Sequence, residues 1–286
     1  HALPRSLESL HLSIGNSFQF VTKRVSPIQE DFPSLKNLTL EGFEHVMTLS
    51  SSELAKLTGI TKLSAAIALD IDELASLPRS LIHLSKLTIK QNKKKPGIVE
   101  DAKSLPPALE SLEISVGQFA ACVIRGIHAS GSLRDTLRIL TLLDVQPKTK
   151  SEEVIKIDNE LFALLPPHLT SLCFKISVDS HGFWDTQAPT IGDQLCDGRI
   201  MTTLPPTLTS LELSFPAILG AQFVHLPVGL RTLRLAADRQ TKNEDMAYLP
   251  RGLTELDLHE AGISPGCFEF LPRGLTRFNP TSFSGS

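Results

Sequence analysis

The chain has 286 residues and a formal net charge of −3, with 28 basic and 31 acidic residues. This near balance gives no general attraction to polyanions or to anionic lipid, so we expect no nucleic acid among the partners. No segment approaches the ~20 consecutive apolar residues of a membrane-spanning helix, which predicts that the chain does not insert into a membrane.

The four cysteines at positions 122, 173, 196 and 267 form no C-x-x-C pair and no cluster. Because small secreted modules concentrate their cysteines into a disulfide framework, this spread favours a reducing compartment and therefore the cytoplasm. One Asn-x-Thr glycosylation sequon, at Asn37, points the other way. We expect Asn37 to lie in a strand, where the match has no role.

One pattern recurs along the whole chain. It is seen in LPRSLESLHLS (3–13), LPPALESLEIS (105–115), LPPTLTSLELS (204–214) and LPRGLTELDLH (249–259). The copies align on the middle leucine of L-x-x-L-x-L, at Leu10, Leu38, Leu63, Leu87, Leu112, Leu140, Leu172, Leu211, Leu233, Leu256 and Phe278. Successive copies are 22 to 39 residues apart. A unit of this size is too small to bury its own apolar face and has to stack on its neighbours.

Each copy predicts the same succession of elements. The x-L-x-L part alternates with period 2, which predicts a strand with its leucines on the core side. The preceding Leu-Pro is unsuited to a helix, because proline lacks an N–H and biases the residue before it towards extended backbone. Upstream of some strands are helix starts: Ser50-x-x-Glu53 and Asp70-x-x-Glu73 have the form of capping boxes, and Ser264-Pro265 of a cap with a first-turn proline.

Over nearly its whole length the chain resembles the leucine-rich repeat family, and the Leu-Pro-Pro copies are similar to those of secreted bacterial effectors. The resemblance implies an α/β solenoid with a concave parallel β-sheet and short helices or irregular turns on the convex side. We expect a single solenoid over 1–286, of about eleven coils, with longer insertions at 144–164 and 178–203.

The sequence departs from the family in one respect. The family places an asparagine three residues after the last strand leucine, where it bonds the backbone of the next coil. Here the corresponding residues are Gly15, Phe43, Gly117, Val145, Ser177, Pro216, Asp238 and Ala261. The buried backbone groups of these coils therefore need other partners.

The outward strand positions provide the first candidate binding residues. The residues between the two strand leucines are His11, Thr39, Ser64, Thr88, Glu113, Thr141, Cys173, Glu212, Arg234, Asp257 and Asn279. Glu212, Arg234 and Asp257 have alternating charge on adjacent coils. They are candidates for contact with a protein or peptide, although such neighbours also pair with each other.

The longest insertion provides the second candidate. It contains the only tryptophan of the chain, Trp184, together with His181 and Asp185. Long insertions are often functional and tryptophan is common at binding hot spots. The alternative is a local lid in which Trp184 packs back onto the solenoid.

No motif for catalysis, nucleotide binding or metal binding is present. The stretch from His259 to Ile263 begins like H-E-x-x-H but lacks the second histidine. We therefore predict a protein-interaction module that is not an enzyme and takes no cofactor. The alternative is that the chain is the recognition arm of a larger enzyme, such as a ubiquitin ligase or its substrate adaptor.

Overall fold

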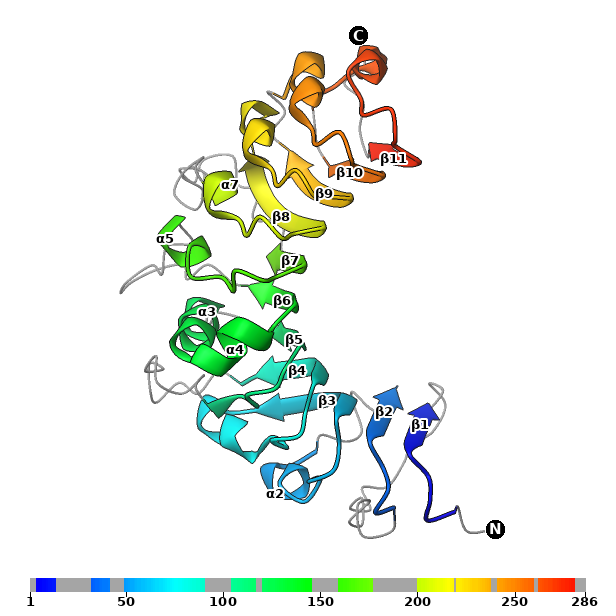
Figure 1. The fold of residues 1–286 in the computed structure, drawn as a ribbon, viewed down its shortest axis with the longest axis vertical. Helices are drawn as coiled ribbons and strands as arrows, with labels where there is room; N and C mark the ends of the chain where they lie inside the picture. The colour runs from blue at the N-terminus through cyan, green and yellow to red at the C-terminus, as the bar shows by residue number, and fades with distance from the viewer. Residues whose placement is uncertain are drawn as a thin grey trace, which may run out of the picture. The chain divides into compact units, whose positions relative to one another are not determined.

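The computed structural model describes residues 4–13, 32–41, 49–90, 104–116, 120–145, 159–176, 200–218, 220–237, 241–259 and 262–280. The chain divides into two compact units, His1–Leu137 and Arg138–Ser286. Its strands are parallel and follow chain order from β1 to β11 (Figure 1).

The first unit contains five strands and short helices. Its elements are β1 (Ser9–Ser13), β2 (Asn37–Glu41), α2 (Ser51–Leu54), β3 (Lys62–Leu69), the 3-10 helix η1 (Ile71–Ser76), β4 (His83–Ile89), β5 (Ser111–Ser115), α3 (Ala120–Ala129) and α4 (Gly131–Thr136).

The second unit contains six strands. Its elements are β6 (Ile139–Val145), α5 (Asn159–Phe162), β7 (Ser171–Ile176), α7 (Ile200–Thr203), β8 (Ser210–Ile218), η4 (Gly220–His225), β9 (Thr232–Ala237), η5 (Asn243–Tyr248), β10 (Glu255–His259), η6 (Pro265–Glu269) and β11 (Arg277–Pro280). Its short helices lie on the side of the coils away from the strands (Figure 1).

The strand leucines form the core, as the period-2 pattern predicts. In the second unit Leu140, Leu172, Leu211, Leu233, Leu256 and Phe278 pair in register from β6 to β11. Leu211 and Leu233 are fully buried. The leucines stack from coil to coil because a parallel register places the same position of each strand on the same face. The predicted α/β solenoid with a parallel sheet is confirmed.

The predicted register is wrong in one coil. Leu84, and not Leu87, pairs with Leu63 on β3 and with Leu112 on β5. Leu87 pairs with Ile67 and Ile114 instead, so β4 contains one residue more than β5 between these two pairs. The extra residue forms a bulge.

The bulge also changes the outward positions of this coil. Ser85, and not Thr88, pairs with Ser64, while Thr88 pairs with Ala68 and Ser115. Within the bulge Lys86 has a φ of 63° and is the non-glycine residue with positive φ in the described part of the chain. The spacing predicts the wrong register because Leu84-x-x-Leu87-x-Ile89 has the form of the repeat, although Leu84 is already a residue of the strand.

The Leu-Pro-x-x-Leu segment forms a tight turn in coil after coil. The proline carbonyl accepts a hydrogen bond from the N–H of the second leucine, for example from Leu208 to Pro205 at 3.2 Å and from Leu253 to Pro250 at 3.1 Å. The leucine before the proline is extended, with φ −61° and ψ 143° at Leu249. This is the predicted effect of a following proline, and it separates each helix from the next strand.

Threonine and serine hydroxyls connect successive coils. The residue just before each strand accepts two backbone N–H groups from the next coil: the Arg138 carbonyl accepts from Thr170 at 2.8 Å and from Ser171 at 3.1 Å. In several coils a hydroxyl adds a third hydrogen bond. These bonds run from Thr61 to Lys36, Thr170 to Arg138, Thr209 to Thr170, Thr254 to Arg231 and Thr276 to Thr254.

A second set of hydroxyls lies in the turns. The Thr207 hydroxyl lies 3.0 Å from the carbonyl oxygen of Pro167 and 2.7 Å from that of Leu169. Thr136 and Ser80 contact two carbonyls of the preceding coil in the same way. We call the two sets together the hydroxyl ladder. Most positions of the missing asparagines lie outside the described residues, and the hydroxyl ladder adds side-chain donors to backbone carbonyls of neighbouring coils.

The predicted helix starts are present. Ser50 caps α2, with its N–H donating to the Glu53 carboxylate at 2.8 Å and its hydroxyl accepting from the Glu53 N–H at 3.4 Å. At η1 the Asp70 N–H donates to the Glu73 carboxylate at 3.0 Å. Pro265 occupies the first turn of η6.

Candidate functional site

Besides Cys173 and Glu255, the outward face of β7 to β10 presents five charged or titratable side chains. Because side chains alternate along a strand, Glu212 points away from the core between the buried Leu211 and Leu213, and Arg234 and Asp257 do so on the next two strands. Residues two positions along share the face. The five are Lys175, Glu212, Arg234, Asp257 and His259, which we call the charged row.

The strand register sets the neighbours within the charged row. Glu212 on β8 lies directly opposite Cys173 on one side and Arg234 on the other. Its two carboxylate oxygens contact two cations, Lys175 Nζ at 2.9 Å and Arg234 Nη1 at 3.7 Å. Glu212 is thus the anionic centre of a three-residue group that spans three coils.

Asp257 lies opposite Arg234 in the register, yet its closest charged contact is on its own strand. The imidazole Nε2 of His259 lies 3.4 Å from Asp257 Oδ1. Oδ1 is buried and has no hydrogen-bond partner among the described residues, so the imidazole is at ion-pair distance without hydrogen-bond geometry.

The charged row alters the titration of one of its members. The hydrogen bond to the Glu212 carboxylate raises the pKa of Lys175 above its ordinary value, and partial burial opposes this shift. The negative charge of Glu212 adds to the rise, whereas the neighbouring Arg234 reduces it. Lys175 therefore keeps its positive charge throughout the physiological range.

The structure brings together only some of the candidate residues. Glu212, Arg234 and Asp257 lie on adjacent strands, and Glu212 and Arg234 form an ion pair. His181, Trp184 and Asp185 lie outside the described residues, as do most of the two predicted insertions. Lys175 and His259 were not among the candidates, although their position two residues beyond the column, on the same face of a strand, was sufficient to find them.

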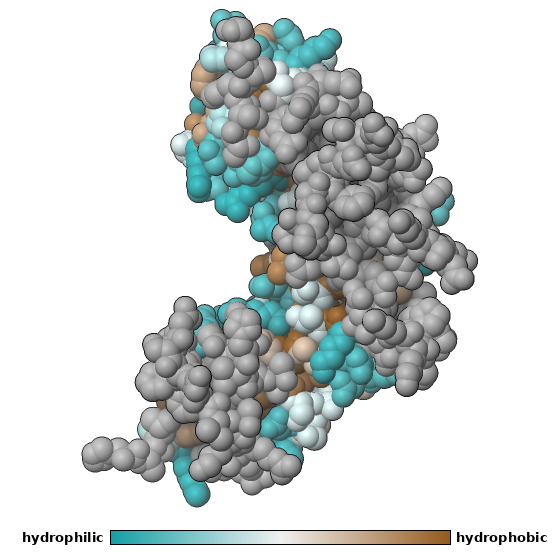
Figure 2. Space-filling model, turned by 180° about the vertical axis from the view of Figure 1, so that it is seen from behind, coloured by the Kyte–Doolittle hydropathy of each residue, from teal (hydrophilic) through white to brown (hydrophobic). Residues whose placement is uncertain are grey.

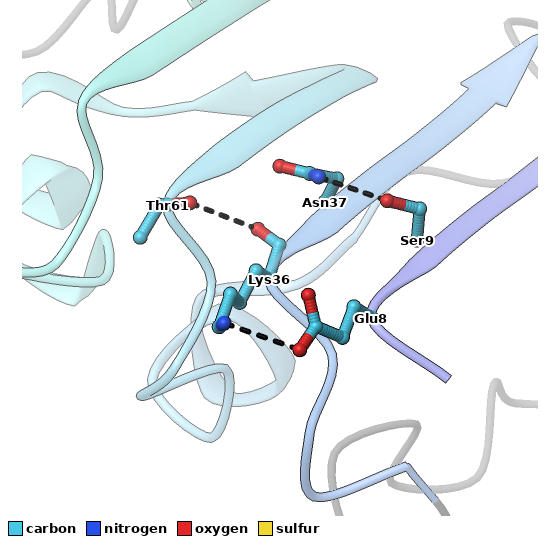
Figure 3. A network of polar contacts seen from close by, with 5 residues as sticks. All are labelled: Glu8, Ser9, Lys36, Asn37 and Thr61. Atoms are coloured by element: carbon cyan, nitrogen blue, oxygen red, sulfur yellow. Dashed lines mark hydrogen bonds and ion pairs between the residues drawn. The ribbon is translucent and has the colours of Figure 1, made fainter. Parts of the chain in front are cut away.

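A polar network of a different kind connects the first three coils (Figure 3). Lys36 Nζ lies 3.3 Å from the Glu8 carboxylate, and the Asn37 amide donates to the Ser9 hydroxyl at 2.8 Å. The Thr61 hydroxyl donates to the Lys36 carbonyl at 3.4 Å. Asn37 lies within β2, as predicted, and its amide nitrogen, the atom a glycan would occupy, bonds to the neighbouring strand.

The described residues include no metal cluster and no membrane-spanning helix. Among the described residues no group of three or more His, Cys, Asp and Glu side chains is placed to bind a metal ion, and none of the helices is long and apolar enough to cross a membrane. Cys122, Cys173 and Cys267 form no disulfide with one another in the described part of the chain. Burial raises the pKa of Cys267, which lies in the core.

The coil-to-coil register of leucines and the repeated Leu-Pro-x-x-Leu turn decide the architecture. The fold is that of a leucine-rich repeat solenoid. No protein-family model and no curated protein matches the chain.

Solved structures of leucine-rich repeat proteins are similar to this chain at low identity. The leucine-rich repeat-containing protein LegL7 from Legionella pneumophila is 15% identical, with a TM-score of 0.41, over 88% of this chain and 81% of that one. An internalin, inlF, from Listeria monocytogenes is 15% identical, with a TM-score of 0.38, over 99% and 88% of the two chains. CroV588, a circular leucine-rich repeat protein, is 21% identical, with a TM-score of 0.38, over 99% and 41%.

Proposed function

We propose that this leucine-rich repeat chain is a protein-interaction module without catalytic activity of its own, and that it binds its partner through the charged row. A stack of strands offers an extended face, which suits a protein or peptide better than a small substrate. The observation that carries the proposal is the alternation of Lys175, Glu212, Arg234 and Asp257 across four adjacent strands.

The partial burial of the charged row supports this choice of face. The Glu212 and Asp257 side chains are only 25% and 22% exposed. Partly buried charges are screened less by salt than fully exposed ones. They therefore present a defined pattern of charge that a partner of complementary charge recognises.

The test is a simultaneous charge reversal at three positions. Glu212→Arg, Arg234→Glu and Asp257→Arg together keep the alternation on these three strands, so the Glu212–Arg234 pair is retained with its charges exchanged, Lys175 loses its anionic partner, and the field presented to a binding partner changes sign. We expect the fold to survive and the affinity to fall. The partner is first captured with the purified chain and identified by mass spectrometry. Calorimetry then measures the affinity of the wild type and of the triple variant for this partner.

A matched control reverses another pair on the sheet. Glu8→Lys with Lys36→Glu swaps the ion pair of the first two coils and keeps its geometry. The control is expected to bind like the wild type, and thermal melts of both variants check that they fold. Unchanged affinity in the triple variant would remove the charged row from the proposal.

We include Trp184, with His181 and Asp185, as a second contact in the proposed interface. A tryptophan at a binding hot spot typically contributes about 2 kcal/mol or more on truncation to alanine. Trp184→Ala should therefore weaken binding by at least about tenfold without lowering the melting temperature. A lowered melting temperature with unchanged affinity would instead assign Trp184 to a lid that packs on the solenoid.

A further inference from the structure

The turns at the amino ends of β9 to β11 repeat the same geometry in three consecutive coils. Each turn has a hydrogen bond from the second leucine to the proline carbonyl, at Leu230, Leu253 and Leu275, all of 3.1 Å. A Cβ placed on Gly229 or Gly274 would lie 3.8 Å from a carbonyl oxygen of the preceding coil. The turns are therefore stacked on one another, and the residue after the proline occupies the same place in each: Val228, Arg251 and Arg273.

Four arginines gather at this edge. Arg251 and Arg273 project from the turns, Arg231 lies just before β9, and Arg277 is the first residue of β11; all four are exposed. We call them the arginine edge. Adjacent parallel strands are only about 4.8 Å apart, so Arg251 and Arg273, at the same position of adjacent coils, are neighbours. Figure 2 shows a mainly hydrophilic surface on the C-terminal coils where it is not grey.

Most of these guanidinium groups have no partner among the described residues. Arg231 Nη1 donates to the Gly252 carbonyl at 2.8 Å, which connects it to the next turn. The Arg277 backbone N–H donates to the Thr254 carbonyl at 3.1 Å, but the side chains of Arg251, Arg273 and Arg277 form no hydrogen bond or ion pair within the described part of the chain. The half-buried Glu255 lies opposite Arg277 in the strand register, but the two do not form an ion pair. Three of the four guanidinium groups therefore keep all their donors available.

We propose that the arginine edge binds an acidic segment of a partner protein. Unpaired arginines repel one another, and a guanidinium forms charge-assisted, often bidentate hydrogen bonds with a carboxylate. A run of Asp or Glu side chains would relieve the repulsion and satisfy the free donors. Val228, which is 90% exposed in the neighbouring turn, gives the segment an apolar contact.

The charge of the whole chain favours a short acidic segment over nucleic acid. The net charge is −3, so a long polyanion that extends beyond the arginine edge meets no further attraction. This inference rests on the proposed protein-binding function but uses a different surface from the charged row. Its failure is therefore distinguishable from failure of the proposed function.

The test measures binding of a fluorescent peptide of alternating glutamate and serine by anisotropy at low ionic strength. We expect the full chain to bind this peptide at low salt and to release it at high salt. A peptide in which glutamine replaces glutamate should not bind. The variant Arg251→Glu/Arg273→Glu should bind it at least about tenfold more weakly.

The matched control is Arg125→Glu/Arg134→Glu, which changes the net charge equally at two exposed arginines of α3 and α4. It should bind within about twofold of the wild type. If the glutamate variant fails to fold, Arg251→Gln/Arg273→Gln replaces it, with an expected intermediate loss. Equal losses in variant and control, no binding by the wild type, or tighter binding of single-stranded DNA or phosphatidylserine vesicles than of the peptide would overturn the proposal.

Discussion

Neighbouring residues on one strand differ sharply in what they contribute to stability. Leu211 is fully buried, whereas Glu212 is partly exposed on the opposite face of the same strand. Leu211→Ala should lower the free energy of unfolding by about 2–5 kcal/mol, because the truncation leaves a cavity in a packed core. Glu212→Ala should lower it by less than about 1 kcal/mol, since it removes only solvent-screened ion pairs. Urea unfolding of both variants measures the difference, and similar losses would contradict the register.

Lys86 holds a backbone conformation that its side chain disfavours. With a φ of 63° it lies in the left-handed region, which costs an L-residue roughly 1–2 kcal/mol. Lys86→Gly should raise the free energy of unfolding by up to about 1 kcal/mol, because glycine has no Cβ to clash. Thr88→Gly, two residues along β4, serves as control and should destabilise by about 0.5–1 kcal/mol. Chemical denaturation measures the stability of both variants. A lower free energy of unfolding in both would show that the backbone is not strained at Lys86.

Glu73 makes stability depend on pH. Its hydrogen bond from the Asp70 N–H lowers the pKa of the carboxyl below its ordinary value; burial opposes this, and the Ser51 hydroxyl and the charge of Lys90 support it. A depressed pKa means that the stabilisation is present above the unfolded-state value and is lost as the pH falls through the folded-state value. Glu73→Ala should therefore destabilise the chain most near neutral pH and progressively less in acid. Unfolding curves for wild type and variant across this range test it, and a constant difference would contradict it.

At the scale of the coil, the hydroxyl ladder connects several coils to backbone carbonyls of the preceding one. Thr207 contacts two carbonyls of the preceding coil. Thr207→Val keeps the shape of the side chain and removes the hydroxyl donor, so it should lower the free energy of unfolding by about 0.5–1.5 kcal/mol. The loss is larger if a carbonyl is left buried without a donor. Thr232→Val on β9 is the control, since the Thr232 hydroxyl makes no hydrogen bond among the described residues. A control as destabilising as Thr207→Val in thermal melts would show that the hydroxyl is not the cause.

At the scale of the whole chain, the first and last described coils are less buried than the others. Leu12 on β1 is 40% exposed and Phe278 on β11 is half-buried, whereas Leu211 is fully buried. A coil with a neighbour on one side only lacks half of its stacking contacts. Amide hydrogen exchange should therefore be fastest in β1 and β11 and slowest in the middle strands of each unit. Protection that is highest in β1 and β11 would show that another surface covers these strands.

Much of the fold follows from short-range patterns. The spacing of Leu211 and Leu213 with a polar residue between them is sufficient to predict a strand, its inward face and its parallel neighbours, because period and repeat length are both local properties of the sequence. Ser50 and Glu53 predict the start of α2 for the same reason: a capping box lies within one helical turn. Most of the leucine register was predicted in this way.

The tertiary structure decided what depends on neighbouring coils. In β4 the pattern favours Leu87 as the middle position, because Leu84-x-x-Leu87-x-Ile89 is complete whereas Leu81-x-x-Leu84 ends at Lys86. Only the pairing with Leu63 and Leu112 places Leu84 in the middle position, by means of a bulge. The charged row likewise depends on side-chain distances across strands, which bring Lys175 to Glu212 and leave Arg234 without an ion pair to Asp257. The sequence by itself determined a repeating coil of buried leucines, because each coil encodes its own alternation. The contacts between coils, and hence the surfaces proposed to bind a partner, were decided only when residues far apart in the chain were placed side by side.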